Sequence, residues 1–209
     1  MTHYLIAAAW VVLGAALGVF VRWGSVRLAV LEELEPGHKP WQVYGPPVLS
    51  SVVFGIFALG VSPFPVLVVR SVFVLVLVQV IFFDFEHRLI LDRVMFPAMG
   101  LAAIVSLFHS PWWGGLAMGL AAGLLFLVIA LVGAAIFRTE ALGFGDVKLA
   151  LFLGLLLGWP YVFQGLLYGV FFAAVGAVVF IVWNRTLKGT IAYGPYLAAG
   201  ALVMLFSLP

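Results

Sequence analysis

Two aspartates, Asp84 and Asp146, stand where an apolar chain can least easily accommodate a charge. Asp84 lies at the end of the apolar run of residues 72–85, and Asp146 directly precedes the run that begins at residue 147. Ionisable groups inside a membrane or at its edge are costly, and they therefore point to a function. Two carboxyl groups that meet could divide the roles of general acid and general base between them. We interpret the two aspartates as a candidate catalytic pair.

The surrounding composition predicts an integral membrane protein. The 209 residues are 66% hydrophobic and 9% charged, and their mean hydropathy is +1.26. A soluble domain of this size cannot bury so much apolar surface, so the lipid bilayer is a predicted partner. The net charge of +2 gives no indication of a nucleic-acid partner. The chain has no cysteine, which excludes disulfides, thiolate nucleophiles and cysteine zinc sites.

The expected elements are helices, because a hydrocarbon core of about 30 Å needs about 20 apolar residues per span. We predict an all-α fold, a polytopic transmembrane helical bundle of about eight spans. Between the runs, residues 22–45 form the only sizeable polar segment, which we expect to be a loop. The predicted apolar runs cover residues 4–21, 46–62, 64–85, 94–109, 113–136, 147–159, 161–183 and 191–208.

Basic residues predict the orientation of these spans, since cytoplasmic loops carry an excess of Lys and Arg. With eight spans, every Lys and Arg except Arg70 falls on one side. We therefore expect a multi-pass protein of the cytoplasmic (inner) membrane with both termini outside the cytoplasm. Asp84 and Asp146 then share a depth at the cytoplasmic side, a necessary condition for cooperation but no proof of contact.

Residues 143–148 (GFGDVK) form the strongest local pattern. Gly143 and Gly145 allow either a positive φ or a close approach to another helix. Asp146 would lie at a helix N-terminus, where the helix dipole favours an anion. A plain helix N-cap is the structural alternative for this aspartate.

Two further segments contain polar residues or helix breakers next to apolar runs. In residues 84–92 (DFEHRLILD), Asp84 is nearest the apolar run, whereas Glu86, His87, Arg88 and the following Arg93 are interpreted as an ordinary charged loop. For Asp92 we favour helix capping over chemistry. In residues 189–198 (GTIAYGPYLA), Gly194 and Pro195 are expected to interrupt a helix, so that the freed backbone groups line a cavity or pack against protein.

The ordered combination of D-x6-hydrophobic-D, G-x-G-D-x-K and Y-G-P-Y-L-A resembles the type IV prepilin peptidase family over roughly residues 66–205. The family comprises membrane-embedded GxGD aspartyl proteases. The resemblance implies that Asp84 and Asp146 are catalytic, with supporting roles for Gly143, Gly145, Lys148, Asp92, Gly194 and Pro195. Lys148 matches the lysine after GxGD and is assigned to local electrostatics. Leu91 stands where many members have proline.

The N-terminal part departs from the family pattern, because the paired CxxC motifs of the cytoplasmic loop are absent. The resemblance divides the chain into residues 1–45, a first transmembrane helix with a short loop lacking the zinc and methylase cysteines, and residues 46–209, a membrane-embedded peptidase domain. No metal site is predicted. Proteolysis is expected to need no cofactor, and S-adenosylmethionine would be used only if methyltransferase activity is retained.

The implied substrates are prepilins or pseudopilins, cut after a short basic leader at the cytoplasmic membrane edge. Four alternatives remain open: a transporter that couples ions or protons through the aspartates, a presenilin-type GxGD protease, a preflagellin peptidase, and a non-catalytic scaffold. A presenilin-type enzyme would carry Pro-Ala-Leu late in the chain, where this sequence has Tyr-Gly-Pro-Tyr. The oligomeric state, including a homo-oligomer, is left open by the sequence.

Overall fold

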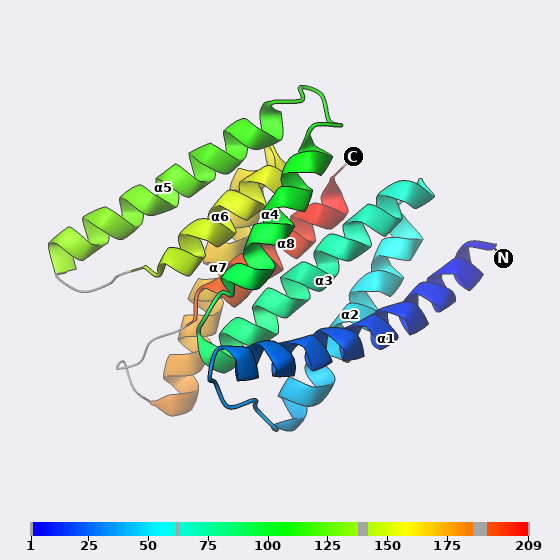
Figure 1. The fold of residues 1–209 in the computed structure, drawn as a ribbon, viewed down its shortest axis with the longest axis horizontal. Coiled ribbons are helices and arrows are strands. Elements are labelled where there is room, and N and C mark those ends of the chain that lie inside the picture. Colours follow the sequence, from blue (N-terminus) through cyan, green and yellow to red (C-terminus); the bar gives the residue numbers. More distant parts are fainter. Residues whose placement is uncertain (1, 62, 138–141, 186–191, 209) are drawn as a thin grey trace. The chain divides into compact units, whose positions relative to one another are not determined.

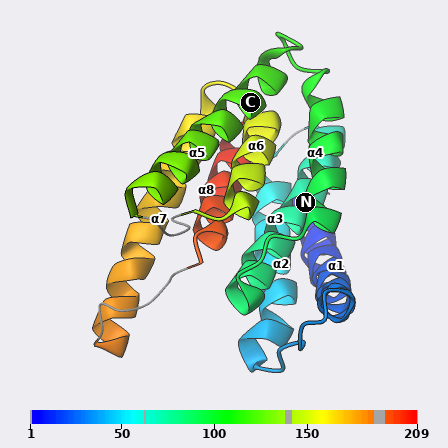
Figure 2. The same ribbon diagram turned by 60° about the vertical axis from the view of Figure 1, so that its left-hand side comes forward.

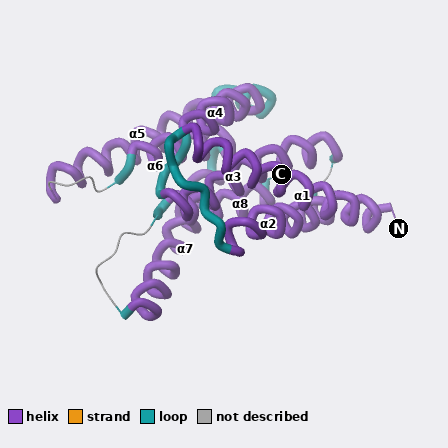
Figure 3. The backbone as a smooth tube through the Cα atoms, turned by 60° about the horizontal axis from the view of Figure 1, so that its bottom comes forward, coloured by secondary structure: helices purple, strands orange, loops and turns teal. Residues whose placement is uncertain are grey.

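The described part of the chain consists of helices joined by short connections. The structure is a computed structural model that describes residues 2–61, 63–137, 142–185 and 192–208 (Figure 1). Within these ranges there is no strand, and the tube in Figure 3 is coloured as helix and loop only. The helices are α1 (Thr2–Leu31), α2 (Pro40–Gly60), α3 (Phe64–His87), α4 (Asp92–Ser106), α5 (Gly114–Phe137), α6 (Phe144–Leu157), α7 (Tyr161–Asn184) and α8 (Gly194–Ser207).

Every apolar run predicted from the sequence corresponds to one of these helices, so the all-α polytopic prediction is confirmed. Five helices, α1, α2, α3, α5 and α7, are long and apolar enough to cross a membrane. The other three are shorter, with 15 residues in α4 and 14 in each of α6 and α8. At 1.5 Å per residue, 14 residues reach roughly 21 Å, less than a hydrocarbon core. Of the eight predicted spans, five are therefore helices of full spanning length and three are shorter helices.

The prediction of a loop for residues 22–31 is wrong, because α1 continues through them to Leu31. No proline lies within this stretch, and the first strong helix breaker is Pro36, followed by Gly37. Leucine, arginine and alanine favour helix, so two basic residues can extend α1 without ending it.

The first compact unit comprises residues 1–88 and contains α1, α2 and α3. Helix α1 packs closely on α2 at Gly18, where an added Cβ would lie 2.5 Å from the Cα of Pro47. Two hydrogen bonds tie α1 to α3: Trp10 Nε1 donates to Ser71 Oγ at 3.0 Å, and Ser25 Oγ donates to the Gln79 Oε1 at 2.9 Å. The middle portion of α3 is thereby fixed against α1 at two positions, about two helical turns apart.

The second compact unit comprises residues 89–209, and α6 is its core. Helix α6 contacts α4, α5, α7 and α8, and Figures 1 and 2 show it beside α5. Its side chains Leu149, Ala150, Phe152 and Leu153 are fully buried. Because protein surrounds it, a helix too short to span the bilayer does not have to match the hydrocarbon thickness. The site that begins α6 therefore rests on a rigid element.

Glycine permits the closest helix contact in this unit, between α5 and α6. A Cβ added at Gly154 would lie 2.6 Å from the Cα of Gly119 and still closer to the carbonyl oxygen of Met118. Small residues at such crossings let the helix backbones approach each other in membrane proteins.

Replacing Gly154 by alanine is expected to destabilise the protein by about 1–3 kcal/mol, because backbone atoms cannot make room for the methyl group. The matched control is Gly100→Ala in α4, where an added Cβ meets nothing within 4 Å. That control should leave the stability unchanged or raise it by up to about 1 kcal/mol. Thermal unfolding in detergent compares the two variants, and equal unfolding temperatures would contradict the close α5–α6 contact.

Candidate active site

Asp84 lies in the last turn of α3, at the end of an almost continuously apolar helix. Its side chain is buried, with 5% of the residue surface exposed. Arg88 ends the helix in a left-handed conformation with φ of 55°, and its N–H donates to the Asp84 carbonyl oxygen at 2.8 Å. Asp84 is thus held on a regular helical turn, although it is only three residues from the helix end.

Asp146 lies in the first turn of α6, after the N-cap residue Gly143. It is outside the five helices long enough to span a membrane. Burial disfavours the carboxylate and raises the pKa of Asp146 to about 6, while a backbone hydrogen bond with Gly143 acts in the opposite direction. A carboxyl group with such a pKa can be protonated or ionised near neutral pH, as general acid–base catalysis requires.

The two glycines that precede Asp146 serve different purposes. Gly143 has φ of −72° and Gly145 is helical, so neither needs the positive φ that the sequence allowed. A Cβ at Gly145 would lie 3.0 Å from the Cβ of Ile90, so this glycine provides the close approach. At Gly143 the nearest atom to an added Cβ is Asp146 Oδ2, at 3.8 Å.

Lys148 and Asp92 form an ion pair that joins the N-terminal parts of α6 and α4. The Lys148 Nζ atom donates to Asp92 Oδ1 at 2.5 Å, and the same ammonium group lies 5.5 Å from the centroid of the Phe96 ring. The expected capping role of Asp92 is wrong, because Leu91 is the N-cap residue and Asp92 is the first residue of the helix. Lys148 takes part in local electrostatics, two residues after Asp146.

Gly194 and Pro195 begin α8 rather than interrupting it. Both are buried, and proline fits the first turn because its missing N–H would have no partner there. The preceding residues Gly189, Thr190 and Ile191 of the same sequence pattern lie outside the described residues.

Tyr193, the N-cap residue of α8, is a neighbour of Asp146 that sequence reasoning missed. Burial raises the pKa of the Tyr193 phenol, and the negative charge of Asp146 raises it further. A phenol that stays protonated keeps its O–H as a hydrogen-bond donor. The sequence did contain a signal for this residue, since Tyr193 directly precedes the helix breakers Gly194 and Pro195.

Glu86 and His87 have largely shielded side chains, and their interpretation as part of an ordinary charged loop is wrong. Both belong to the last turn of α3, and their side chains are 5% and 9% exposed. Glu86 is paired with Arg22 of α1. Glu86 is two residues after Asp84, just as Lys148 is two residues after Asp146.

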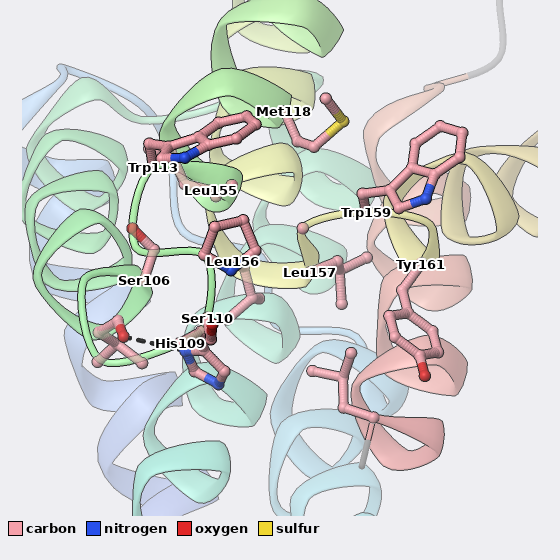
Figure 4. Close-up of a pocket in the computed structure, with 16 residues that line it drawn as sticks. Ser106, His109, Ser110, Trp113, Met118, Leu155, Leu156, Leu157, Trp159 and Tyr161 are labelled. Atoms are coloured by element: carbon pink, nitrogen blue, oxygen red, sulfur yellow. Dashed lines mark hydrogen bonds between the residues drawn. The ribbon is translucent and has the colours of Figure 1, made fainter.

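A cavity of about 460 Å³ in the second unit lies away from Asp146. It is lined by the ends of α4, α6 and α8 and the beginnings of α5 and α7. Figure 4 shows Trp159 and Tyr161 on one side of it and Ser106 and His109 on the other. Asp146 begins α6 whereas the cavity meets its last turn, so roughly 15 Å of helix separates them.

The expectations that the chain has no metal site and needs no cofactor for proteolysis remain predictions. Among the described residues there is no group of three or more His, Asp or Glu side chains that could hold a metal ion. The conditional use of S-adenosylmethionine is not tested by these contacts. The division of the chain after residue 45 also stays a prediction.

The pKa of Asp146 predicts how stability changes with pH. Between its ordinary value of 3.8 and about 6, the folded protein keeps a proton that the unfolded chain has released. The free energy of unfolding should therefore fall as the pH rises through this window. In Asp146→Asn the side chain cannot ionise, so this part of the slope should disappear. Unfolding temperatures of both proteins, measured across the window in detergent, test this; parallel curves would contradict the raised pKa.

The Lys148–Asp92 pair should contribute little to stability, because its side chains are 31% and 52% exposed. A double-mutant cycle with Lys148→Ala and Asp92→Asn should give a coupling energy below about 1 kcal/mol, and salt should reduce it. Chemical or thermal unfolding of the four proteins provides the measurement. A coupling well above that value would show that water does not screen the pair.

Comparisons with known proteins agree with the sequence patterns. The Type IV leader peptidase family matches residues 71–182, more than half of the chain, a range that includes both aspartates. A prepilin leader peptidase/N-methyltransferase of Bacillus subtilis (strain 168) is 28% identical over 151 residues, which are 70% of this chain and 57% of that protein. The chain thus spans a little over half the length of this relative. No solved structure matches this chain. With the family match extending over both helix ends that carry Asp84 and Asp146, the chain is a multi-pass membrane protein of the type IV leader peptidase family.

Proposed function

We propose that the protein is an aspartic endopeptidase that removes the short leader from prepilins or pseudopilins at the cytoplasmic edge of the membrane. The observation that carries the proposal is Asp146, a part-buried carboxyl group with a pKa of about 6 within the segment that matches the family. Asp84, buried at a second helix end in the same matched segment, supplies the partner carboxyl group.

The mechanism needs the two carboxyl groups in different protonation states. The ionised aspartate takes a proton from water, which attacks the scissile carbonyl carbon. The protonated aspartate donates to the developing oxyanion, and a proton then passes to the leaving amine. Like charges close together cannot both ionise easily, so the pair would share one proton and titrate jointly. The pairing of Asp84 with Asp146 is part of this proposal.

The substrate class rests on family membership and on the printed name of the relative, a prepilin leader peptidase/N-methyltransferase. A site at the cytoplasmic membrane edge could receive a soluble leader while the hydrophobic segment of the substrate stays in lipid. Methylation of the new N-terminus is not proposed, because the cysteine motifs associated with it are absent from this chain.

Asp84→Asn and Asp146→Asn should each lower kcat for cleavage of a short-leader prepilin by at least about a hundredfold, because each variant lacks one acid–base group. The matched control is Glu35→Gln, the same chemical change at an exposed carboxyl group of the α1–α2 connection. Its kcat should stay within about threefold of wild type.

Cleavage is measured in membranes or detergent, with the amount of inserted protein determined for each variant. Wild-type protein that is folded but inactive on several pilin-like substrates would contradict the proposed function. Cleavage that survives either aspartate substitution would contradict the catalytic pair.

A further inference from the structure

Arg22, Gly37 and Glu86 form a cluster that joins three segments of the first unit, and we call it the Arg22 clamp. Arg22 Nη1 of α1 donates to Glu86 Oε2 of α3 at 2.8 Å. Arg22 Nη2 donates to the carbonyl oxygen of Gly37 in the α1–α2 connection. The Gly37 N–H donates to the second carboxylate oxygen, Glu86 Oε1, at 2.5 Å. Each of the three residues therefore contacts the other two.

The clamp is shielded from water. The side chain of Arg22 is 11% exposed and that of Glu86 is 5% exposed. Hydrogen bonds between ionised groups are strong, and both carboxylate oxygens of Glu86 are occupied. A buried ion pair does not necessarily add stability, but removal of one partner leaves an uncompensated buried charge. The geometry of the clamp is therefore strongly enforced once the unit has folded.

The α1–α2 connection is built to bring Gly37 to this position. An added Cβ at Gly37 would overlap the end of the Gln42 side chain, which would have to move away. Gln42 is itself buried, and its Oε1 accepts a hydrogen bond from the Lys39 N–H at 2.8 Å. The connection is thus fixed at both ends, by the clamp and by the first turn of α2.

The clamp acts on the helical turn that carries Asp84. Glu86 is two residues after Asp84, and α3 ends one residue later at His87. The last carbonyl groups of a helix have no partner within it, so a terminal turn frays unless something holds it. The carboxylate of Glu86, fixed by α1 and by the α1–α2 connection, provides that restraint.

We propose that Arg22 and Glu86 are positioning residues, which hold the last turn of α3 so that the Asp84 carboxyl group is correctly placed for peptide cleavage. This inference rests on the proposed function of Asp84. Arginine suits the role because its planar guanidinium group can donate to Glu86 and to the Gly37 carbonyl oxygen at the same time. Lysine has a single ammonium group and would keep the charge without that fork.

The test compares kcat and KM for prepilin cleavage by folded Arg22→Ala, Glu86→Gln, the double variant and Arg22→Lys. Each of the first two should lower kcat by about tenfold to a hundredfold with KM within about threefold, because a small misplacement of a catalytic group slows the reaction. The double variant should be no slower than the slower single variant, since both changes break the same clamp. Arg22→Lys should recover part of the lost kcat.

Ser71→Ala is the matched control, because it removes the Trp10–Ser71 hydrogen bond between the same two helices, in the N-terminal half of α3 and far from Asp84 in the sequence. It should lower the unfolding temperature without changing kcat per folded protein. A purely structural clamp would behave like this control, with unchanged kcat in the folded fraction.

The outcomes separate this inference from the proposed function. Active wild type with Arg22→Ala and Glu86→Gln within threefold of its kcat would overturn the positioning role and leave the peptidase assignment intact. Losses that multiply in the double variant would also overturn it, because they would show independent effects. If Arg22→Ala does not fold, the kcat of Glu86→Gln alone decides the positioning role, because glutamine keeps the shape of the glutamate side chain. An inactive wild type would overturn the proposed function itself.

Discussion

The structure depends on how charged side chains are held at the ends of apolar helices. A carboxylate in an apolar environment needs hydrogen bonds or an opposite charge, or it takes up a proton. Three solutions occur in this chain. Glu86 is fully paired inside the Arg22 clamp, Asp92 is paired at the surface with Lys148, and Asp146 keeps a raised pKa instead.

These solutions occur close to the candidate catalytic residues. Two residues after Asp84 comes the paired Glu86, and two residues after Asp146 comes the paired Lys148. In each unit the ion pair connects the helix that carries the aspartate to another helix of the same unit. Catalytic carboxyl groups need a fixed position and an adjustable proton. On the proposed function, the ion pairs fix the helix turns and the candidate catalytic aspartates keep the adjustable proton.

Much of the fold followed from hydropathy, because each apolar run became a helix, but the limits of the runs were less predictable. Helix α1 continues through Arg22 to Leu31, since charged side chains do not end a helix when proline is absent. The shortness of α6 could be read from Gly154, Gly158 and Pro160, but its burial within the second unit could not, since burial depends on neighbours distant in the sequence. Hydropathy also predicted that Asp84 and Asp146 lie at helix ends, because each aspartate borders an apolar run.

The contacts around the aspartates were the least predictable part of the site. Glu86 looked like a loop residue because its partner, Arg22, is 64 residues away in the sequence. Tyr193 was visible within a sequence pattern, yet only the fold brings its phenol under the influence of Asp146. Asp92 resembled a helix cap, whereas its carboxylate binds Lys148. Long-range side-chain pairs of this kind leave no periodic signal in one sequence.

The most direct test of the catalytic pair is a cross-linking measurement, which the absence of native cysteine makes specific. Asp84→Cys and Asp146→Cys are combined in one protein, treated in membranes with an oxidant or a short bifunctional thiol reagent, and the peptides are identified by mass spectrometry. Paired aspartates predict a peptide that links positions 84 and 146, whereas a control with Asp84→Cys and His109→Cys should give no such link. Two accessible thiols at positions 84 and 146 that never become linked would contradict the pair.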